Sequence, residues 1–433
     1  MLRVLRKIIK KLIPTSLFKR VEPFGHLIEA IAANVYYGFP SRGMHVIGVT
    51  GTNGKTTTSF MIHKMLTDAG YDVALMTTVA YGVRDDITPQ IAHMTTASAP
   101  LLQKRLRDFK RAGVKWVVLE TTSHALAQHR VWGIPYELAV MTNVTHEHLD
   151  YHGTFDAYLA AKQQLFVVAN KHGMRFGVVN ADDPNAQYFI DAVPDSISYG
   201  VHTGQLTASK VKLQPSGSAY IATIGGDEYH IHTQIPGEFN VYNSMAAVAV
   251  GRKLGLTTEQ IERGIAALDG VEGRMTTVDA GQKFSVIVDF AHTPDSFERL
   301  LGDVRKTTKG NLVVMFGSAG RRDEAKRAIQ GEIAGKYGDI VVLTEEDDRD
   351  IDGHEILDQI AAGAEKSGKK RGKDLLLELD RSKAIKLAIS KAKNADDTVI
   401  LLGKGHEKTI ERADGEHPWD EVAEVKKCLK SKK

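Results

Sequence analysis

The stretch GVTGTNGKTTT, residues 48–58, constrains the fold more than any other part of the sequence. An apolar, strand-like run at residues 45–49 leads into it, and a helix-like run at residues 56–69 follows it. In a strand–glycine loop–helix unit, glycines let backbone N–H groups wrap a polyphosphate at the N-terminus of the helix. The sequence therefore predicts a nucleotide-binding loop made of Gly51, Thr52, Asn53, Gly54, Lys55, Thr56 and Thr57.

The chemistry of this loop depends on two of its side chains. Lys55 would reach the outer phosphates, and the hydroxyl of Thr56 would contact Mg²⁺. The spacing departs from the strict Walker A pattern, which would place its first glycine at Val49. A glycine- and threonine-rich turn without a ligand is the alternative interpretation, and the position between strand and helix favours the nucleotide.

Apolar runs alternate with helical patterns along the chain, which predicts an α/β fold. The first group of runs lies at residues 46–49, 73–76, 114–119, 138–141 and 176–179. This alternation is typical of a parallel sheet that binds ligands beyond the carboxyl ends of its strands. Residues 207–232 are typical of antiparallel strands, and a second alternating section begins near residue 284. We expect a short N-terminal helical segment (1–44), a central P-loop ATPase-type domain (45–270) and a C-terminal Rossmann-like domain (271–433).

Composition limits the location and the partners of the chain. The single cysteine, Cys428, excludes an internal disulfide and is consistent with the cytoplasm. No apolar run reaches the length of about 18 residues that a membrane span needs. The net charge of +3 is small and no basic–aromatic interleaving is present, so nucleic acid is not an expected partner.

The first twenty residues differ from the rest because they hold seven Lys/Arg and no Asp/Glu. On a helical wheel, one side of this segment is apolar, formed by Leu2, Leu5, Ile9 and Leu12. Such a segment can lie on an anionic membrane surface, which here would be the inner face of the membrane. A terminal helix that packs on the protein body with a solvated basic face is the alternative.

Three polar clusters follow apolar strands. Glu120 comes directly after a buried run, where a lone carboxylate is costly unless it is paired or binds a cation. The segment NVTHEHLDYHGTFDAYLAAK contains Asn143, His146, His148, Asp150, His152 and Lys162. The segment FGSAGRRDEAKR gathers three arginines and one lysine after a glycine turn and predicts an anion site.

Two other functional classes remain open from these residues. HEHLDYH is similar to the HxHxDH zinc signature of metallo-β-lactamases, although Tyr151 stands where that pattern needs its last histidine and His152 comes one position late. A zinc hydrolase would leave the glycine loop unexplained. A nucleotide-binding module without catalysis would leave Glu120, His148 and Lys162 unexplained.

Several segments, taken together, resemble the Mur ligase family. They are the glycine loop, ETTSHALAQHR, NVTHEHLDYHGTFDAYLAAK, GEFNVYNSMAA, GRM, VIVDFAHTPDSFERLL and GSAGRRDEAKR. The resemblance is strongest to the members that add the third peptide residue to UDP-N-acetylmuramoyl-L-alanyl-D-glutamate in peptidoglycan precursor synthesis. It implies an ATP- and Mg²⁺-dependent amide ligase that works through an acyl phosphate. Residues 1–44 are too few for the separate UDP-binding domain of that family.

The resemblance also implies roles around ATP and the metal. Thr56, Glu120 and His148 would hold Mg²⁺, and Lys162 would be carbamoylated and help to position it. From the residues alone, His148 would be structural and Lys162 an ordinary exposed helix lysine. Asn243 would contact adenine, Arg274 the nucleotide and Asp289 the ribose; without the family they are interpreted as a cap, a surface charge and a strand-end turn.

On the substrate side, the resemblance implies a muramoyl-peptide site, reacting groups and an amino-acid site. Lys326 would act near the reacting groups, and the substrate-binding residues would be Thr95, Thr96, Ser123, Gln128, Arg130, His292, Arg322, Asp347, Arg349, Gly403 and Glu407. Where diaminopimelate-adding members read DNPR, this chain has EDDR, residues 346–349. Arg349 favours meso-diaminopimelate, whereas the extra acids equally suit L-lysine. A ligase that acts on a different carboxylate carrier, including a membrane-held one, is the other alternative.

Overall fold

The computed structural model describes residues 15–90, 95–214 and 216–430 of the chain. The apolar positions Leu2, Leu5, Ile9 and Leu12 of the basic segment therefore lie outside the described residues. The chain falls into two compact units: Met1–Ser209 with Ile221–His230 and Tyr242–Ala267, and Lys210–Tyr220 with Ile231–Val241 and Leu268–Lys433. Each unit is described by itself below.

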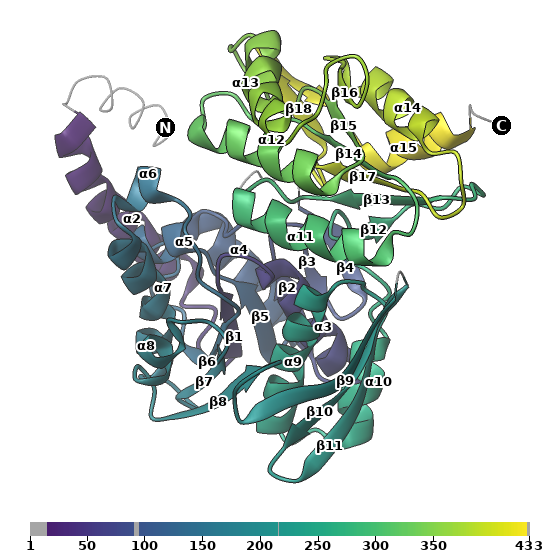
Figure 1. Ribbon diagram of the computed structural model, residues 1–433. Helices are drawn as coiled ribbons and strands as arrows, with labels where there is room; N and C mark the ends of the chain where they lie inside the picture. The colour runs from purple at the N-terminus through teal and green to yellow at the C-terminus, as the bar shows by residue number, and fades with distance from the viewer. Residues whose placement is uncertain (1–14, 91–94, 215, 431–433) are drawn as a thin grey trace. The chain divides into compact units, whose positions relative to one another are not determined.

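The glycine loop follows an inner strand of a large sheet whose middle part is parallel (Figure 1). That strand is β1 (His45–Thr50), which pairs in parallel with β5 (Trp116–Glu120) and β6 (Tyr136–Met141). Further parallel strands extend the sheet on both sides: β2 (Val73–Met76), β7 (Phe176–Asn180) and β8 (Asp195–Gly200). The carboxyl ends of β1, β5 and β6 therefore meet at one edge, where the predicted polar clusters lie.

The remaining strands lie at the two ends of this sheet, whose order is β11-β10-β9-β8-β7-β6-β1-β5-β2-β3-β4. At one end is a hairpin of β3 (Ala80–Val83) and β4 (Asp86–Pro89), which the sequence did not predict. At the other end are β9 (Leu206–Gln214), β10 (Gly217–Ile224) and β11 (Asp227–Thr233). These last three occupy residues 207–232, where the sequence predicted strands.

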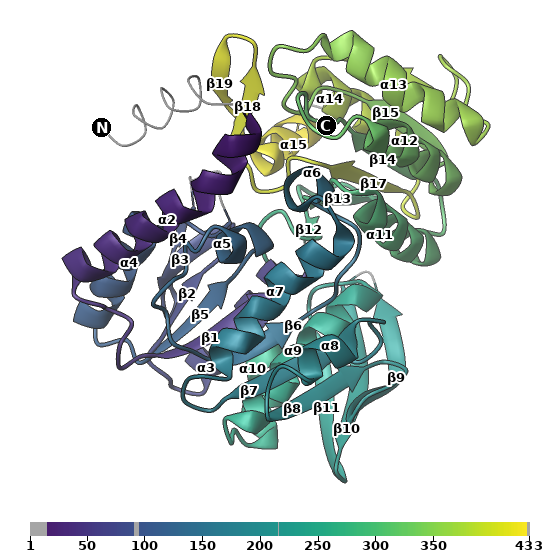
Figure 2. The ribbon, with the colours of Figure 1, turned by 90° about the vertical axis from the view of Figure 1, so that its left-hand side faces the viewer.

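Helices cover both faces of the sheet in the first unit (Figure 2). One group packs on alternate strand residues and comprises α4 (Ala99–Arg111), α5 (Ser123–Ala127), α7 (Phe155–Ala169) and α8 (Ala186–Ile190). The other face carries α3 (Lys55–Asp68), α9 (Glu238–Lys253) and α10 (Thr258–Ala266). Right-handed crossovers explain why the helices divide between the two faces. The chain moves in one direction across the sheet from β1 to β2 and back in the other from β2 to β5, so the connecting helices α3 and α4 lie on opposite faces. The short α6 (Leu149–His152) precedes α7, and α2 (Thr15–Tyr37) packs on α4.

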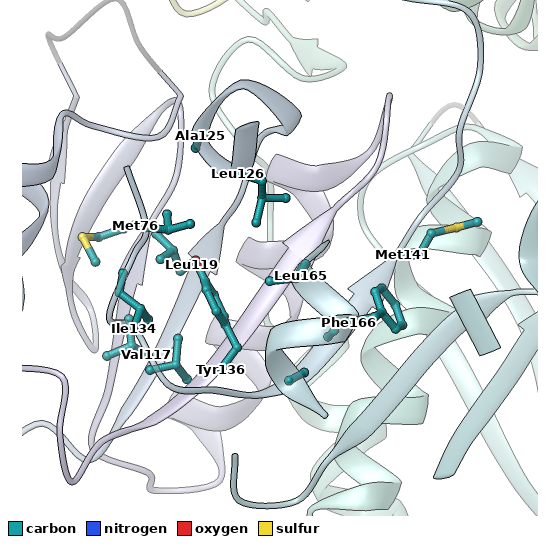
Figure 3. Close-up of a cluster of buried hydrophobic side chains, with 14 of the residues drawn as sticks. Met76, Val117, Leu119, Ala125, Leu126, Ile134, Tyr136, Met141, Leu165 and Phe166 are labelled. Carbon is teal, nitrogen blue, oxygen red and sulfur yellow. The ribbon is translucent and has the colours of Figure 1, made fainter. Parts of the chain in front are cut away.

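The core beneath the site joins α5 and α7 to the strands (Figure 3). Leu119 of β5, Leu126 of α5 and Leu165 of α7 belong to it. Gly48 lets α7 approach β1 closely, since a Cβ there would lie 2.6 Å from Leu165 Cδ1 and 2.7 Å from Tyr136 Cδ1. Any side chain at Gly48 would push apart the strand that leads to Lys55 and the helix that carries Lys162.

The second unit contains a six-stranded sheet in the order β12-β13-β17-β14-β15-β16. Its strands are β12 (Thr276–Thr277), β13 (Ser285–Asp289), β14 (Leu312–Phe316), β15 (Ile340–Leu343), β16 (Leu375–Leu377) and β17 (Thr398–Leu402). All pairs except β12–β13 are parallel. The helices are α11 (Pro294–Thr307), α12 (Ala325–Tyr337), α13 (Gly353–Lys366), α14 (Arg381–Lys391) and α15 (Glu421–Lys430), and a hairpin is formed by β18 (Thr409–Arg412) and β19 (Gly415–Pro418).

The predicted α/β class is therefore confirmed, and the apolar runs of both alternating sections are strands. Within the described part of the chain, no helix combines the length and the apolar character that crossing a bilayer requires.

Candidate active site

At two positions of the glycine loop, the backbone conformation is one that glycine adopts readily and other residues do not. Gly51 has φ 149° and Gly54, directly before α3, has φ 82°. A Cβ at Gly51 would lie 1.9 Å from Thr142 Oγ1, and one at Gly54 would lie 2.3 Å from Asn243 Oδ1. The loop is therefore pressed against the end of β6 on one side and against α9 on the other.

The segment after β6 holds the loop in place through Asn143. The Asn143 carbonyl accepts from Thr52 N (2.8 Å), and its side-chain Oδ1 accepts from Asn53 N (3.0 Å). Asn143 Nδ2 and Thr142 Oγ1 both donate to the Asn53 carbonyl, at 3.0 and 2.6 Å. Sequence reasoning placed Asn143 in a polar cluster without giving it a role; its position directly after a strand beside the loop strand was the available signal.

Two lysines from different elements converge on one carbonyl of the loop. Lys55 Nζ donates to the carbonyls of Gly51 (3.0 Å) and Thr52 (2.7 Å), while Lys162 Nζ of α7 donates to the Gly51 carbonyl at 2.6 Å. Lys162 is 1% exposed, so the interpretation as an exposed helix lysine was wrong. Burial and the positive charge of Lys55 hold the pKa of the Lys162 amine well below its usual value, although Glu147 and Glu120 oppose this.

Glu120 is buried at the end of β5 and is paired by neutral groups. Its Oε2 accepts from Thr56 Oγ1 (3.0 Å) and from Thr78 N (2.9 Å), and Thr78 Oγ1 lies 3.1 Å from both carboxylate oxygens. A carboxylate and a hydroxyl side by side are the hard oxygen ligands that Mg²⁺ prefers. Thr78 was not predicted; only its place at the end of β2, next to β5, could have indicated it.

The histidines after β6 lie among other rings, and His148 and His152 both contact His124. The His148 ring meets His124 edge-on, with centroids 4.6 Å apart, and its Nε2 lies 3.6 Å from Glu147 Oε2. His152 Nε2 lies 3.1 Å from Ser123 Oγ, and the His146 ring lies against Phe155. Among the residues the structure describes, no three His, Cys, Asp or Glu side chains converge as a metal-ligand set. The side chain of Asp150, the acid that the zinc pattern needs, is not among those the structure describes.

Several predicted substrate residues of the first unit adjoin Glu120. Thr96 Oγ1 donates to the Glu120 carbonyl (3.1 Å) and accepts from Thr122 N (3.1 Å). Arg130 donates from Nη1 to the Thr96 carbonyl, and both of these residues are buried. Thr95 is half-buried beside Thr96, Ser123 is buried in α5, and Gln128 follows the last residue of that helix.

In the second unit, residues from three segments gather at the end of β13. Asp289 Oδ2 accepts from Met275 N and its Oδ1 from Ala291 N, both at 2.7 Å. Burial raises the pKa of Asp289, although Arg274 and these two N–H groups oppose the rise. The Arg274 guanidinium lies over the Phe290 ring.

Two further predicted residues meet beside this strand end. Lys326 Nζ donates to the His292 carbonyl at 3.1 Å, and His292 Nδ1 lies 2.9 Å from the Phe290 carbonyl oxygen. Arg322 is exposed in the segment before α12. The structure thus places Arg274, Asp289, His292 and Lys326 around one strand end.

The acidic segment after β15 is organised around Lys404, which sequence reasoning missed. Lys404 is 1% exposed, and its Nζ lies 2.8 Å from Asp347 Oδ1 and 2.6 Å from Glu407 Oε2. Gly403 has φ 101°, and a Cβ there would lie 2.6 Å from Glu346 Oε2. The location of Lys404 inside GKGHE, between two singled-out residues, was the available signal.

Arg349, two residues after Asp347, contacts β18 and the segment that follows β14. Its Nε donates to Glu411 Oε2 of β18 at 2.8 Å, and its Nη1 donates to the Gly320 carbonyl. Next to it, burial raises the pKa of Asp348 to about 6; the Glu346 N–H opposes this rise, whereas nearby carboxylates add to it. The second unit therefore presents a buried cluster rich in carboxylates. In this cluster Arg349 already pairs with Glu411.

Two family models match the chain: the Mur ligase middle domain at residues 49–251 and the Mur ligase, glutamate ligase domain at residues 273–405. A UDP-N-acetylmuramyl-tripeptide synthetase of Roseiflexus sp. (strain RS-1) is 40% identical over 421 residues, covering 94% of this chain and 82% of the relative. A UDP-N-acetylmuramoyl-L-alanyl-D-glutamate--2,6-diaminopimelate ligase of Geobacillus thermodenitrificans is 38% identical over 421 residues, covering 95% and 84%.

Solved structures give the same picture of the fold. A UDP-N-acetylmuramoyl-L-alanyl-D-glutamate--2,6-diaminopimelate ligase matches with TM-score 0.63 and 30% identity, covering 90% of this chain and 79% of that one. A folylpolyglutamate synthase of Mycobacterium tuberculosis, complexed with ADP and AMPPCP, matches with TM-score 0.70 and 17% identity, covering 87% and 92%. At that identity the second likeness concerns the fold alone.

Proposed function

The chain belongs to the Mur ligase family, whose members are ATP-dependent ligases of peptidoglycan precursor synthesis, and on that premise we propose its reaction. It joins the amine of a diamino acid, meso-diaminopimelate, to the glutamate carboxylate of UDP-N-acetylmuramoyl-L-alanyl-D-glutamate. The observation that carries the proposal is the buried group of Thr56, Glu120 and Lys162 at the glycine loop. Residues 45–270 would form the ATP-binding domain and residues 271–433 the Rossmann-like domain that receives the amino acid.

The glycine loop would hold the β- and γ-phosphates of ATP, with Lys55 turning from its own loop carbonyls to the outer phosphates. Asn243 would contact adenine, Arg274 the nucleotide and Asp289 the ribose. Thr56 and Glu120, with His148, would hold Mg²⁺, which neutralises phosphate charge during transfer. The pairing of the Thr56 hydroxyl with the Glu120 carboxylate fits that ion.

Carbamoylation of Lys162 is the chemistry its surroundings support. An amine whose pKa is held low by burial and by Lys55 is neutral more often, and only a neutral amine attacks carbon dioxide. The carbamate would replace a second cation by an anion beside the metal ligands. Protein incubated with ¹³C-bicarbonate should show a carbamate carbon signal that Lys162→Arg lacks; an identical spectrum for both proteins would contradict the modification.

The reaction would proceed in two balanced steps. A carboxylate oxygen attacks the γ-phosphorus while the bond from that phosphorus to the ADP oxygen breaks, giving an acyl phosphate and ADP. The amine then attacks the acyl carbon, phosphate leaves with the carbon–oxygen bonding pair, and the nitrogen loses a proton. Lys326 and Arg322 would neutralise the charge that develops in these steps, and His292 would line the site.

The muramoyl peptide would bind near Thr95, Thr96, Ser123, Gln128 and Arg130.

Isotope transfer tests the first chemical step, because the carboxylate oxygen that attacks phosphorus leaves with the phosphate. With ¹⁸O in the glutamate carboxylate of the dipeptide substrate, the released phosphate should carry one ¹⁸O atom per turnover. Phosphate without label would mean that ATP is hydrolysed by water and that no acyl phosphate forms.

L-lysine is the second candidate amino acid, and a specific contact favours it. Arg349, the residue expected to bind the distal carboxylate of diaminopimelate, is paired with Glu411. The buried acid Glu346 nearby suits an ammonium group instead, whereas Asp347 already pairs with Lys404. Competition between the two amino acids for one limiting carrier distinguishes the candidates by the mass of the product.

The proposed location is the cytoplasm at the inner face of the membrane, through the basic N-terminal segment. A different carboxylate carrier, held in the membrane, would be consistent with the same location. Cell fractionation tests the location, since a protein found only in the soluble fraction at low salt would contradict it.

A further inference from the structure

Helix α2 carries a stripe of exposed apolar side chains that the proposed reaction does not use. Phe24, Ile28, Ile31 and Val35 are 67%, 67%, 38% and 63% exposed. Their alternating spacing of four and three residues places them along one face of the helix. We call these four residues the α2 stripe.

The opposite face of α2 already attaches the helix to the first unit. Ala30 and Ala33 are buried against Ala99 of α4, and Asn34 Nδ2 donates to the Trp132 carbonyl at 2.9 Å. In Figure 2 the helix runs along α4. The α2 stripe is therefore not needed to hold the helix in place and points away from its packed side.

Basic residues precede the α2 stripe in the sequence and are exposed on the neighbouring helix. Residues 1–20, which lead into this part of the helix, contain seven Lys/Arg and no Asp/Glu. On the neighbouring α4, Lys104, Lys110 and Arg111 are exposed, together with one acid, Asp108, so basic residues predominate there.

The two acids on the described part of α2 lie beside His26, within 3.9 Å for Glu22 and 3.7 Å for Glu29. At 3.6 residues per turn, both fall on the side of the helix away from the α2 stripe. They therefore do not interrupt the apolar face that the α2 stripe forms.

We propose that the α2 stripe docks on the surface of a bilayer that contains anionic lipids. An apolar stripe beside many basic residues is the pattern of a helix that lies in the headgroup region of a membrane. Anionic headgroups complement the charge, whereas a dimer through the same stripe would bring two strongly basic segments together. This inference concerns attachment and does not depend on the reaction proposed above.

The size of the effect follows from the exposed side chains. Removing one large apolar side chain that inserts into lipid should weaken binding about tenfold, so Phe24→Ser/Ile28→Ser should weaken it by roughly 50-fold or more. Each basic residue near an anionic surface adds about five-fold to the binding constant, and salt reduces this contribution.

Sedimentation with vesicles tests the proposal on the full-length chain. The vesicles contain phosphatidylcholine with about 30% phosphatidylglycerol, and pure phosphatidylcholine vesicles are the comparison. We expect binding to the anionic vesicles, weakening in high salt, and near-complete loss in Phe24→Ser/Ile28→Ser. Ile329→Ser, at an apolar residue of α12 that is 48% exposed, is the matched control and should bind like the natural sequence.

Circular dichroism and light scattering on the same variants distinguish a loss of docking from unfolding and from a change in oligomeric state. The double variant should keep its helix content and its thermal midpoint, because α2 packs through its other face. Absence of vesicle binding, equal binding to neutral vesicles, or equal binding of the double variant and the natural sequence would each overturn the proposal. A change in oligomeric state caused by the double variant would overturn it in favour of a second copy of the chain.

Discussion

Replacing Asp348 by asparagine should stabilise the second unit at neutral pH. Asp348 is 8% exposed, and its Oδ1 accepts a weak hydrogen bond from Glu346 N at 3.3 Å. Burial and neighbouring carboxylates raise its pKa to about 6, compared with 3.8 for an ordinary aspartate. An asparagine keeps the acceptor oxygen and removes the charge.

The sign and size of the effect follow from these two pKa values. Below about pH 3 the carboxyl group is protonated in both states, so it contributes almost nothing to the pH dependence of stability. As the pH rises towards 6, only the unfolded chain releases the proton, and the folded chain loses stability. The free energy of unfolding of the natural sequence falls by about 1 kcal/mol near pH 4.5, and this decrease levels off at about 3 kcal/mol above neutrality.

Hydrogen exchange of the β15 amides reports the stability of this unit without requiring two-state unfolding of the whole chain. Asp348→Asn should slow this exchange about 100-fold near pH 7.5 and only about five-fold near pH 4.5. The control Asp350→Asn removes an exposed carboxylate whose pKa is lowered by Arg321, so exchange should be unchanged or faster. Equal exchange rates for Asp348→Asn and the natural sequence near neutrality, or an advantage that grows on acidification, would refute the reasoning.

Further substitutions address the loop and the ligand groups. Gly54→Ala should weaken ATP binding and lower the thermal midpoint more than Gly70→Ala. Both glycines have positive φ, but only a Cβ at Gly54 would meet a neighbour within 4 Å, the Asn243 side chain. Equal effects of the two substitutions in calorimetry would exclude the contact with Asn243 as the cause. Glu120→Gln should lower kcat about 100-fold with the fold retained, and a smaller drop in phosphate release would remove Glu120 from the metal site. Glu411→Gln should release Arg349 and lower the KM for diaminopimelate but not for lysine; a parallel change for both would contradict the role given to that pair.

The strands that carry the site could be predicted because both faces of a parallel sheet are buried, which leaves near-continuous apolar runs such as residues 46–49 and 138–141. The β3–β4 hairpin could not, since its short strands are largely polar or partly exposed and lack that signal. The α2 stripe was likewise invisible, because an apolar face of that spacing normally predicts burial.

Site residues divide in the same way. The glycine loop and Glu120 were predictable, because the loop begins directly after β1 and Glu120 stands at the end of β5. The burial of Lys162 was not, because its partner is the Gly51 carbonyl, 111 residues away in the sequence. Lys404 was missed for a related reason: a lysine is expected at the surface unless it is paired, and its partner Asp347 lies on a different segment.

Phosphate release by the purified protein tests the central claim most directly. The assay contains ATP, Mg²⁺, UDP-N-acetylmuramoyl-L-alanyl-D-glutamate and either meso-diaminopimelate or L-lysine, with the product confirmed by mass. Release that requires both the carrier and an amino acid, and a product that contains both, is the predicted result. Bound ATP with no carrier-dependent release for either amino acid would contradict the proposed reaction and direct the search to other carboxylates.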